Sequence, residues 1–97
     1  MKTFVLAFGA HPDDVELGCG GTLAKLVEEG KVCAIVDLTK GELGTRGTEE
    51  TRKQEAKNAA EILGISVREN LGFRDGFLQN SEENQLEIVK MVRKYRP

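Results

Sequence analysis

Apolar residues gather into three short runs along the chain, at residues 3–8, 32–38 and 66–71. The first two runs are nearly continuous and rich in β-branched and aliphatic side chains, which predicts strands buried on both faces. Burial of that kind is typical of parallel sheets in α/β proteins. The third run is shorter, and we interpret it as a third strand of the same sheet.

Amphipathic segments follow each run, with apolar residues at steps of three and four that predict helices. The first covers residues 15–29 before Gly30, the second runs from an N-cap at Thr48 to Gly64, and the third begins at Asn80 or Ser81. The expected apolar stripes are Val15, Cys19, Leu23, Leu26 and Val27; Ala56, Ala59, Ala60 and Leu63; and Leu86, Val89 and Val92.

The predicted order is β-α-β-α-β-α, which indicates an α/β, Rossmann-like three-layer fold with a parallel sheet. Its 97 residues form one domain, residues 1–97. Three strands make a narrow sheet, so we expect an incomplete fold, the N-terminal part of a larger domain. Ligands of such folds bind beyond the carboxyl ends of the strands, where the loops at residues 9–14 and 39–47 are expected.

Composition narrows the function classes. The 14 basic and 16 acidic residues are mixed and give a net charge of −2, which argues against a nucleic-acid partner. The apolar run after Lys2 is too short for a signal peptide or a membrane span, so we expect no membrane partner and a cytoplasmic protein. Cys19 and Cys33 fall in different elements and are expected to be reduced core thiols.

Three polar side chains follow one another at the end of the first strand, in the segment AHPDD. His11 and Asp14 stand three residues apart across Pro12, and imidazole and carboxylate are ligands that suit Zn²⁺. Asp13 then points elsewhere and could act as a general base. The alternative interpretation is structural, in which His11 ends the strand and an aspartate caps the helix.

Glycines interrupt the first predicted helix at Gly18, Gly20 and Gly21 and together cost roughly 2 to 3 kcal/mol of helix propensity relative to alanine. Either they let the helix approach a neighbouring backbone closely, or they form a phosphate-binding turn. The second account is weaker, because a dinucleotide-binding fingerprint places its glycines directly after the first strand.

Three blocks in order, AHPDDVELGCGGT, GELGTRGT and ETRKQEAKNAAEILG, resemble the LmbE-like or PIG-L deacetylase family, with a particular likeness to bacillithiol-biosynthesis deacetylases. The resemblance implies a zinc-dependent hydrolase that removes acetyl from an N-acetylglucosaminyl group of a small acetylated amino-sugar conjugate. It implies one Zn²⁺ bound by His11 and Asp14, with Asp13 as general base, although iron or manganese could occupy such a site. We also expect the full-length form to be a homo-oligomer.

The same resemblance places Arg52 near the active site, although a solvated helix face explains this arginine equally well. It also makes Arg46, Gly47 and Thr48 weaker candidates for the substrate pocket. The family completes its zinc site with a histidine from a later His-x-x-His segment that this sequence lacks, so the 97 residues alone are expected to be inactive.

Two other classes stay open. One is a small nucleotide- or anion-binding α/β module without catalysis, which would use the positive N-terminus of a helix. The other is a non-catalytic association domain that pairs through an uncovered strand edge.

Overall fold

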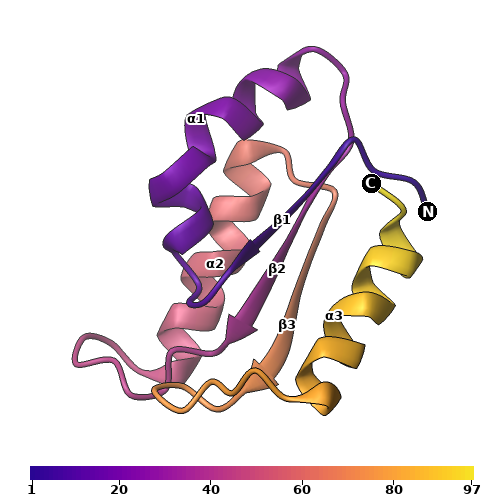
Figure 1. Cartoon of the computed structure of the whole chain (residues 1–97). Coiled ribbons are helices and arrows are strands. Elements are labelled where there is room, and N and C mark those ends of the chain that lie inside the picture. The colour runs from indigo at the N-terminus through magenta and orange to yellow at the C-terminus, as the bar shows by residue number, and fades with distance from the viewer.

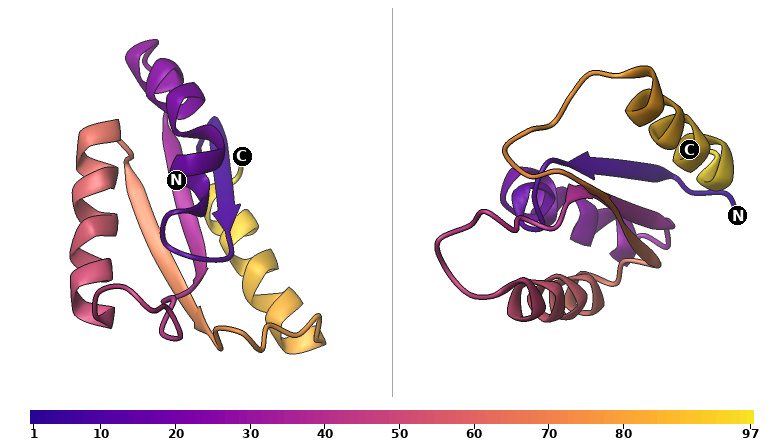
Figure 2. Two further views of the ribbon diagram at one scale, coloured as in Figure 1. Left: turned by 90° about the vertical axis from the view of Figure 1, so that its left-hand side faces the viewer. Right: turned by 90° about the horizontal axis from the view of Figure 1, so that it is seen from below.

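The computed structural model describes all 97 residues and confirms the α/β order β-α-β-α-β-α. The elements are β1 (Val5–Gly9), α1 (Asp14–Glu28), β2 (Cys33–Thr39), α2 (Glu49–Leu63), β3 (Val67–Phe73) and α3 (Glu82–Tyr95). The three strands are parallel and lie in the order β1-β2-β3. Helices α1 and α2 cover one face of the sheet and α3 covers the other (Figures 1 and 2). This arrangement is the predicted Rossmann-like partial fold.

The core lies around β2, which pairs with a strand on each side and is covered by helices on both faces. Cys33 and Ile35 are fully buried against Val15 and Leu23 of α1. Successive side chains of a strand point to opposite faces, so the equally buried Val36 faces α3. The prediction of a strand buried on both faces is therefore confirmed for β2.

Burial on both faces is not observed for β1 in these 97 residues. Four of its five residues are only half-buried, and Gly9 alone is buried. Among the three strands of the sheet, β1 pairs only with β2, so one of its edges is left without a neighbouring strand. The burial of a strand depends on its neighbours as well as on its own apolar content.

Local signals at the ends of α2 and α3 are confirmed. The Thr48 side chain accepts from the Thr51 backbone N–H, and the Thr51 side chain accepts from the Thr48 N–H, so the two residues cap α2 reciprocally. Gly64 ends the helix in the left-handed conformation with φ of 74°. At α3, the N-cap is Ser81, whose side chain accepts from the Asn84 N–H.

Helix α1 buries the predicted apolar stripe but is kinked at Cys19, where φ is −146° and ψ is 19°. The close-approach account of its glycines is not supported. A Cβ at Gly18 or Gly21 would meet nothing within 4 Å, and one at Gly20 would meet only the Glu16 side chain at 3.8 Å. The phosphate-turn account also fails, because all three glycines lie inside the helix.

Helix α3 is joined to the sheet at its C-terminal end, where the two chain termini lie close together (Figure 1). The Thr3 backbone N–H donates to the Tyr95 carbonyl at 2.8 Å. The Tyr95 hydroxyl and the Lys94 ammonium both donate to Glu69 of β3, which holds the pKa of Glu69 below its usual range.

Two further expectations concern membranes and thiols. No helix is both long enough and apolar enough to span a membrane. Cys33 is buried, Cys19 is half-buried, and both are free thiols, as predicted. Burial raises the pKa of the Cys33 thiol, which keeps it protonated and unreactive.

Shortening Ile35 to valine should lower the free energy of unfolding by about 0.5 to 1.5 kcal/mol, because the side chain is fully buried in the core. The matched control is Ile62→Val on α2, since Ile62 is 85% exposed. Urea denaturation followed by circular dichroism measures both. Equal effects of the two substitutions would contradict this description of the core.

Candidate active site

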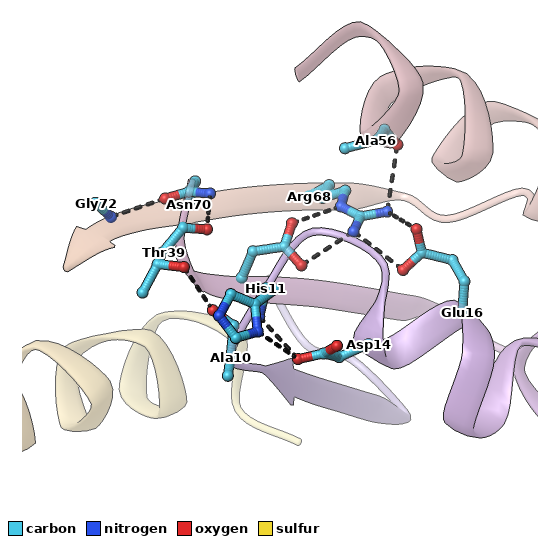
Figure 3. A network of polar contacts seen from close by, with 10 residues as sticks. Ala10, His11, Asp14, Glu16, Thr39, Ala56, Arg68, Asn70 and Gly72 are labelled. Carbon is cyan, nitrogen blue, oxygen red and sulfur yellow. Dashed lines mark hydrogen bonds and ion pairs between the residues drawn. The ribbon is translucent and has the colours of Figure 1, made fainter. Parts of the chain in front are cut away.

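A chain of hydrogen bonds joins the carboxyl ends of the three strands (Figure 3). The Ala10 carbonyl, just after β1, accepts from the backbone N–H of Thr39 at 3.1 Å and from its hydroxyl at 2.8 Å. The Thr39 carbonyl in turn accepts from the Asn70 side-chain amide at 2.8 Å, and the Asn70 side-chain oxygen accepts from the Gly72 N–H. The loops that follow the strands are therefore held side by side.

His11 lies at this edge between two carboxylates. Its Nδ1 is 3.2 Å from Asp14 Oδ2, and its Nε2 is 2.8 Å from Asp75 Oδ1. Asp14 Oδ2 also accepts from the His11 backbone N–H at 2.9 Å. The structure thus brings together the two residues predicted as metal ligands, and it adds an aspartate from the loop after β3.

Asp13 occupies the N-cap position of α1, but its side chain makes no capping hydrogen bond. The side chain is exposed and lines a pocket beside His11. An aspartate at an N-cap ordinarily accepts a backbone N–H of the first turn. Asp13 does not, so the structural interpretation of this residue as a cap is wrong, and its carboxylate is available for other chemistry.

Asp75 is a site residue that the sequence analysis missed. It is buried, and its Oδ2 accepts from the Leu43 backbone N–H at 2.9 Å, while its own N–H donates to Glu42 Oε2. Asp75 therefore ties the loop after β2 to the loop after β3 and to His11. A weak signal existed, because Asp75 is a charged residue placed just beyond the carboxyl end of a predicted strand.

The two carboxylates hold a proton on the histidine. The hydrogen bond with Asp75 is the largest cause that raises the pKa of His11; Asp14 adds to it, and desolvation opposes it. The pKa of Asp75 is lowered, chiefly by the Leu43 N–H and also by His11, against its desolvation. In the absence of a metal ion the pair therefore favours the imidazolium and the carboxylate.

Arg52 reaches into the same pocket from α2. Its guanidinium lies so close to Gly41 and Gly44 that a Cβ at Gly41 would stand 2.9 Å from Cζ, and a Cβ at Gly44 would overlap Nη1. The pocket has a volume of about 380 Å³ and is lined by His11, Asp13, Gly41, Leu43, Gly44, Arg52 and Asp75. Arg52 thus lines the same pocket as His11 and Asp13, and its part in an active site stays a prediction.

Arg46 and Gly47 lie on the exposed part of the loop and do not line this pocket. Gly47 has φ of 72°, and a Cβ there would stand 2.8 Å from the Thr51 hydroxyl. Gly47 directly precedes Thr48, the N-cap residue of α2. A role of these residues in substrate binding stays a prediction.

Below the strand ends, Arg68 of β3 connects several elements, a feature the sequence analysis also missed. Its guanidinium bonds to both carboxylate oxygens of Asp37 on β2 and to both of Glu16 on α1 (Figure 3). Asp37 was predicted only as part of a buried strand. The sequence shows the three charges but not their convergence.

The fit of a metal ion can be judged from the donor groups. No group of three or more histidine, cysteine, aspartate and glutamate side chains is arranged to hold an ion. His11 and Asp14 nevertheless supply an imidazole nitrogen and a carboxylate oxygen that converge. Both donor types suit Zn²⁺, and a catalytic zinc site takes three protein ligands.

Comparison with known proteins identifies the family. The model of the PIG-L family, described as GlcNAc-PI de-N-acetylase, matches residues 6–97. The chain belongs to this family. The predicted resemblance to LmbE-like or PIG-L deacetylases is therefore confirmed.

Three relatives that bear deacetylase names are similar to this chain. The uncharacterized deacetylase YaiS of Escherichia coli K12 is 48% identical over 71 residues, which cover 73% of this chain and 38% of YaiS. Diacetylchitobiose deacetylase of Thermococcus kodakarensis is 39% identical over 100 residues, covering 96% of this chain and 38% of the relative. A probable N-acetyl-α-D-glucosaminyl L-malate deacetylase of Bacillus cereus is only 34% identical. The particular likeness to bacillithiol-biosynthesis deacetylases is therefore not confirmed.

Solved structures share the fold. The conserved protein TT1542 of Thermus thermophilus superposes with a TM-score of 0.92 at 47% identity, covering 98% of this chain and 43% of TT1542. GalB of Pseudomonas putida KT2440, a 4-carboxy-2-hydroxymuconate hydratase, gives 0.83 at 30% identity, covering all of this chain and 45% of GalB. The chain spans about two fifths of the length of the relatives it matches.

Substitution of Asp75 by asparagine should lower the pKa of His11, because it removes the largest cause that raises this pKa above 6.5. NMR titration of the imidazole without metal measures the change. Since the pKa is raised in the folded state, His11 contributes stability fully below pH 6.5, and this is lost as pH rises through the folded pKa. The control Glu83→Gln on α3 should change neither the pKa of His11 nor the pH dependence of stability. An unchanged pKa in Asp75→Asn would contradict the observed pairing.

Substitution of Gly44 by alanine should displace the Arg52 guanidinium, because the new Cβ would overlap it. NMR of the Arg52 Nε–H group reports the displacement. Gly21→Ala is the matched control, since a Cβ there meets nothing within 4 Å. An unmoved Arg52 signal in Gly44→Ala would show that the loop shifts in its place.

Proposed function

We propose that this chain carries the base and two metal ligands of a metal-dependent N-deacetylase that acts on N-acetylglucosaminyl conjugates. The observation that carries the proposal is Asp13, an exposed carboxylate without a capping bond, which lines the same pocket as His11. Membership of the PIG-L family and the deacetylase names of the relatives support the same activity.

His11 and Asp14 would hold one divalent ion, Zn²⁺ in the first instance. Such an ion supplies Lewis-acid polarisation of the amide carbonyl and lowers the pKa of a neighbouring water molecule. Catalytic zinc takes three protein ligands, so we propose that the third is supplied from outside these 97 residues. On this proposal the chain alone binds the ion weakly and does not turn over substrate.

Asp13 would act as the general base. It accepts a proton from water as the water oxygen forms a bond to the acetamide carbon. It then gives that proton to the amine nitrogen as the carbon–nitrogen bond breaks, which yields a free amino sugar and acetic acid, and the acid releases its proton to water to give acetate. The position of Asp13 suits this role, because Asp14 is engaged with His11 whereas Asp13 is free.

Arg52 and Asp75 would bind the sugar. The pocket volume of about 380 Å³ lies within the range of small-molecule sites. The guanidinium of Arg52 donates hydrogen bonds, and the carboxylate of Asp75 accepts them, so together they match the hydroxyl groups of a hexosamine. Asp75 would have to release His11 Nε2 to do so.

Hydration is a second candidate reaction, because GalB, a hydratase by name, is 30% identical to this chain in a match that covers all of the chain. Addition of water to a carbon–carbon double bond would also use a base beside a metal ion. Release of acetate from an N-acetylglucosaminyl conjugate supports deacetylation, whereas hydration of an unsaturated carboxylate without acetate release supports the second reaction.

The anion-binding module has less support. The anion could be received at the N-terminal turn of α1 or of α2; the first carries Asp13 and Asp14, and the second carries Glu49 and Glu50. These carboxylates repel a phosphate group and offset the attraction of the helix dipole.

Replacement of Asp13 by asparagine in a full-length protein that contains this segment should reduce turnover at least ~100-fold and leave the bound metal unchanged. His11→Ala should lose the metal as well. Elemental analysis and an acetate-release assay measure the two effects, with Glu83→Gln as the control. Wild-type rates in Asp13→Asn would show that another group is the base, and metal retained in His11→Ala would exclude the proposed ligand.

A further inference from the structure

Arg68 is a buried side chain in which every hydrogen-bond donor is used. Only 9% of its side chain is exposed. Nε and Nη2 donate to Asp37 at 2.7 and 3.0 Å, Nη1 and Nη2 donate to Glu16 at 3.0 Å each, and Nη1 also donates to the Ala56 carbonyl at 3.2 Å. A guanidinium has five N–H groups, so none is left unpaired.

We infer that Arg68 is a positioning residue that fixes the first turn of α1, with Asp13 and Asp14, against the ends of the strands. The inference rests on the proposed function, which gives those two carboxylates their roles. Arg68 belongs to β3 and bonds to β2, α1 and α2, so it relates four elements to one another. Arg68 bonds to neither Asp13 nor Asp14 and acts on them only through Glu16.

Apart from the hydrogen bonds between Asp14 and His11, the first turn of α1 has few other attachments. Its N-cap residue makes no side-chain hydrogen bond, so local capping does not fix the turn. Val15 is buried and holds the turn by packing. Packing of one side chain constrains how closely the turn approaches the sheet more than the direction in which the turn points. Glu16 adds a two-point contact, since each of its carboxylate oxygens accepts from a different nitrogen of Arg68. Paired bonds of this kind fix orientation as well as distance.

The charges make this link hard to replace. Burial raises the pKa of Asp37, and the hydrogen bonds of Arg68 oppose that rise. Loss of the guanidinium would leave Asp37 buried without its cation, a costly state. Lysine would keep the charge, but its compact ammonium does not offer the planar fork that bonds both carboxylates in pairs.

The test compares Arg68→Lys and Glu16→Ala with wild type in a full-length protein that contains this segment. Glu16→Ala cuts only the contact with α1 and leaves the Arg68–Asp37 pair, so this variant should still fold. The control is Glu69→Gln, on the next residue of β3, which removes contacts with Lys94 and Tyr95 of α3. Each variant is measured by amide hydrogen exchange and by titration with Co²⁺.

Without metal, exchange of the Leu17 amide, which donates to the Asp13 carbonyl, should rise about tenfold in both test variants relative to the amides of β2. Dividing the exchange rate of the Leu17 amide by that of the β2 amides corrects for any change in global stability. The control should leave this ratio unchanged. An unchanged ratio in Arg68→Lys and Glu16→Ala, or the same rise in Glu69→Gln, would overturn the inference.

Co²⁺ affinity should fall about 10- to 100-fold in Arg68→Lys, as is typical when a residue that orients a ligand is replaced. A looser first turn with unchanged Co²⁺ affinity would also overturn the inference. If the wild-type full-length protein bound no Co²⁺, the proposed metal site would fail. The exchange comparison would then decide the role of Arg68 by itself.

Discussion

The pairing of β2 with a parallel strand on each side is the constraint on which the rest of the structure depends. Val5 to Gly9 pair in order with Cys33 to Asp37, and β3 continues the pattern up to a register shift between Asp37 and Thr39. Parallel strands in register end at one edge, so the loops after all three meet there. The site is assembled from segments distant in sequence because the strands that precede them are neighbours.

Much of the fold could be predicted from the sequence, because its signals are local. The apolar run at β2 indicates a strand buried on both faces, and Thr48 and Gly64 mark the ends of α2 through their own hydrogen bonds and backbone conformation. The convergence of His11 and Asp14 also follows from local spacing, since they stand three positions apart at the start of a helix. Such features need no knowledge of the partner segments.

The rest of the site and the burial of β1 could not be predicted, because they depend on contacts between distant segments. Asp75 meets His11 across 64 residues, and Arg68 meets Glu16 across 52. The local pattern shows at most that Asp75 lies just beyond a predicted strand end, and it does not show which distant residue either charge contacts. The half-burial of β1 has the same origin, since exposure of a strand is decided by its neighbours. Charges at or near predicted strand ends would have been the best candidates to examine.

The start of α1 lacks a capping hydrogen bond although its N-cap residue is of a type that makes one well. Aspartate, asparagine and serine are comparably good N-caps, and a capping bond typically stabilises a helix by about 1 kcal/mol. The backbone at Asp13, with φ of −160° and ψ of −10°, leaves that bond unmade. The helix start therefore forgoes this stabilisation. On the proposed function, the carboxylate left unbonded is the one that accepts the proton.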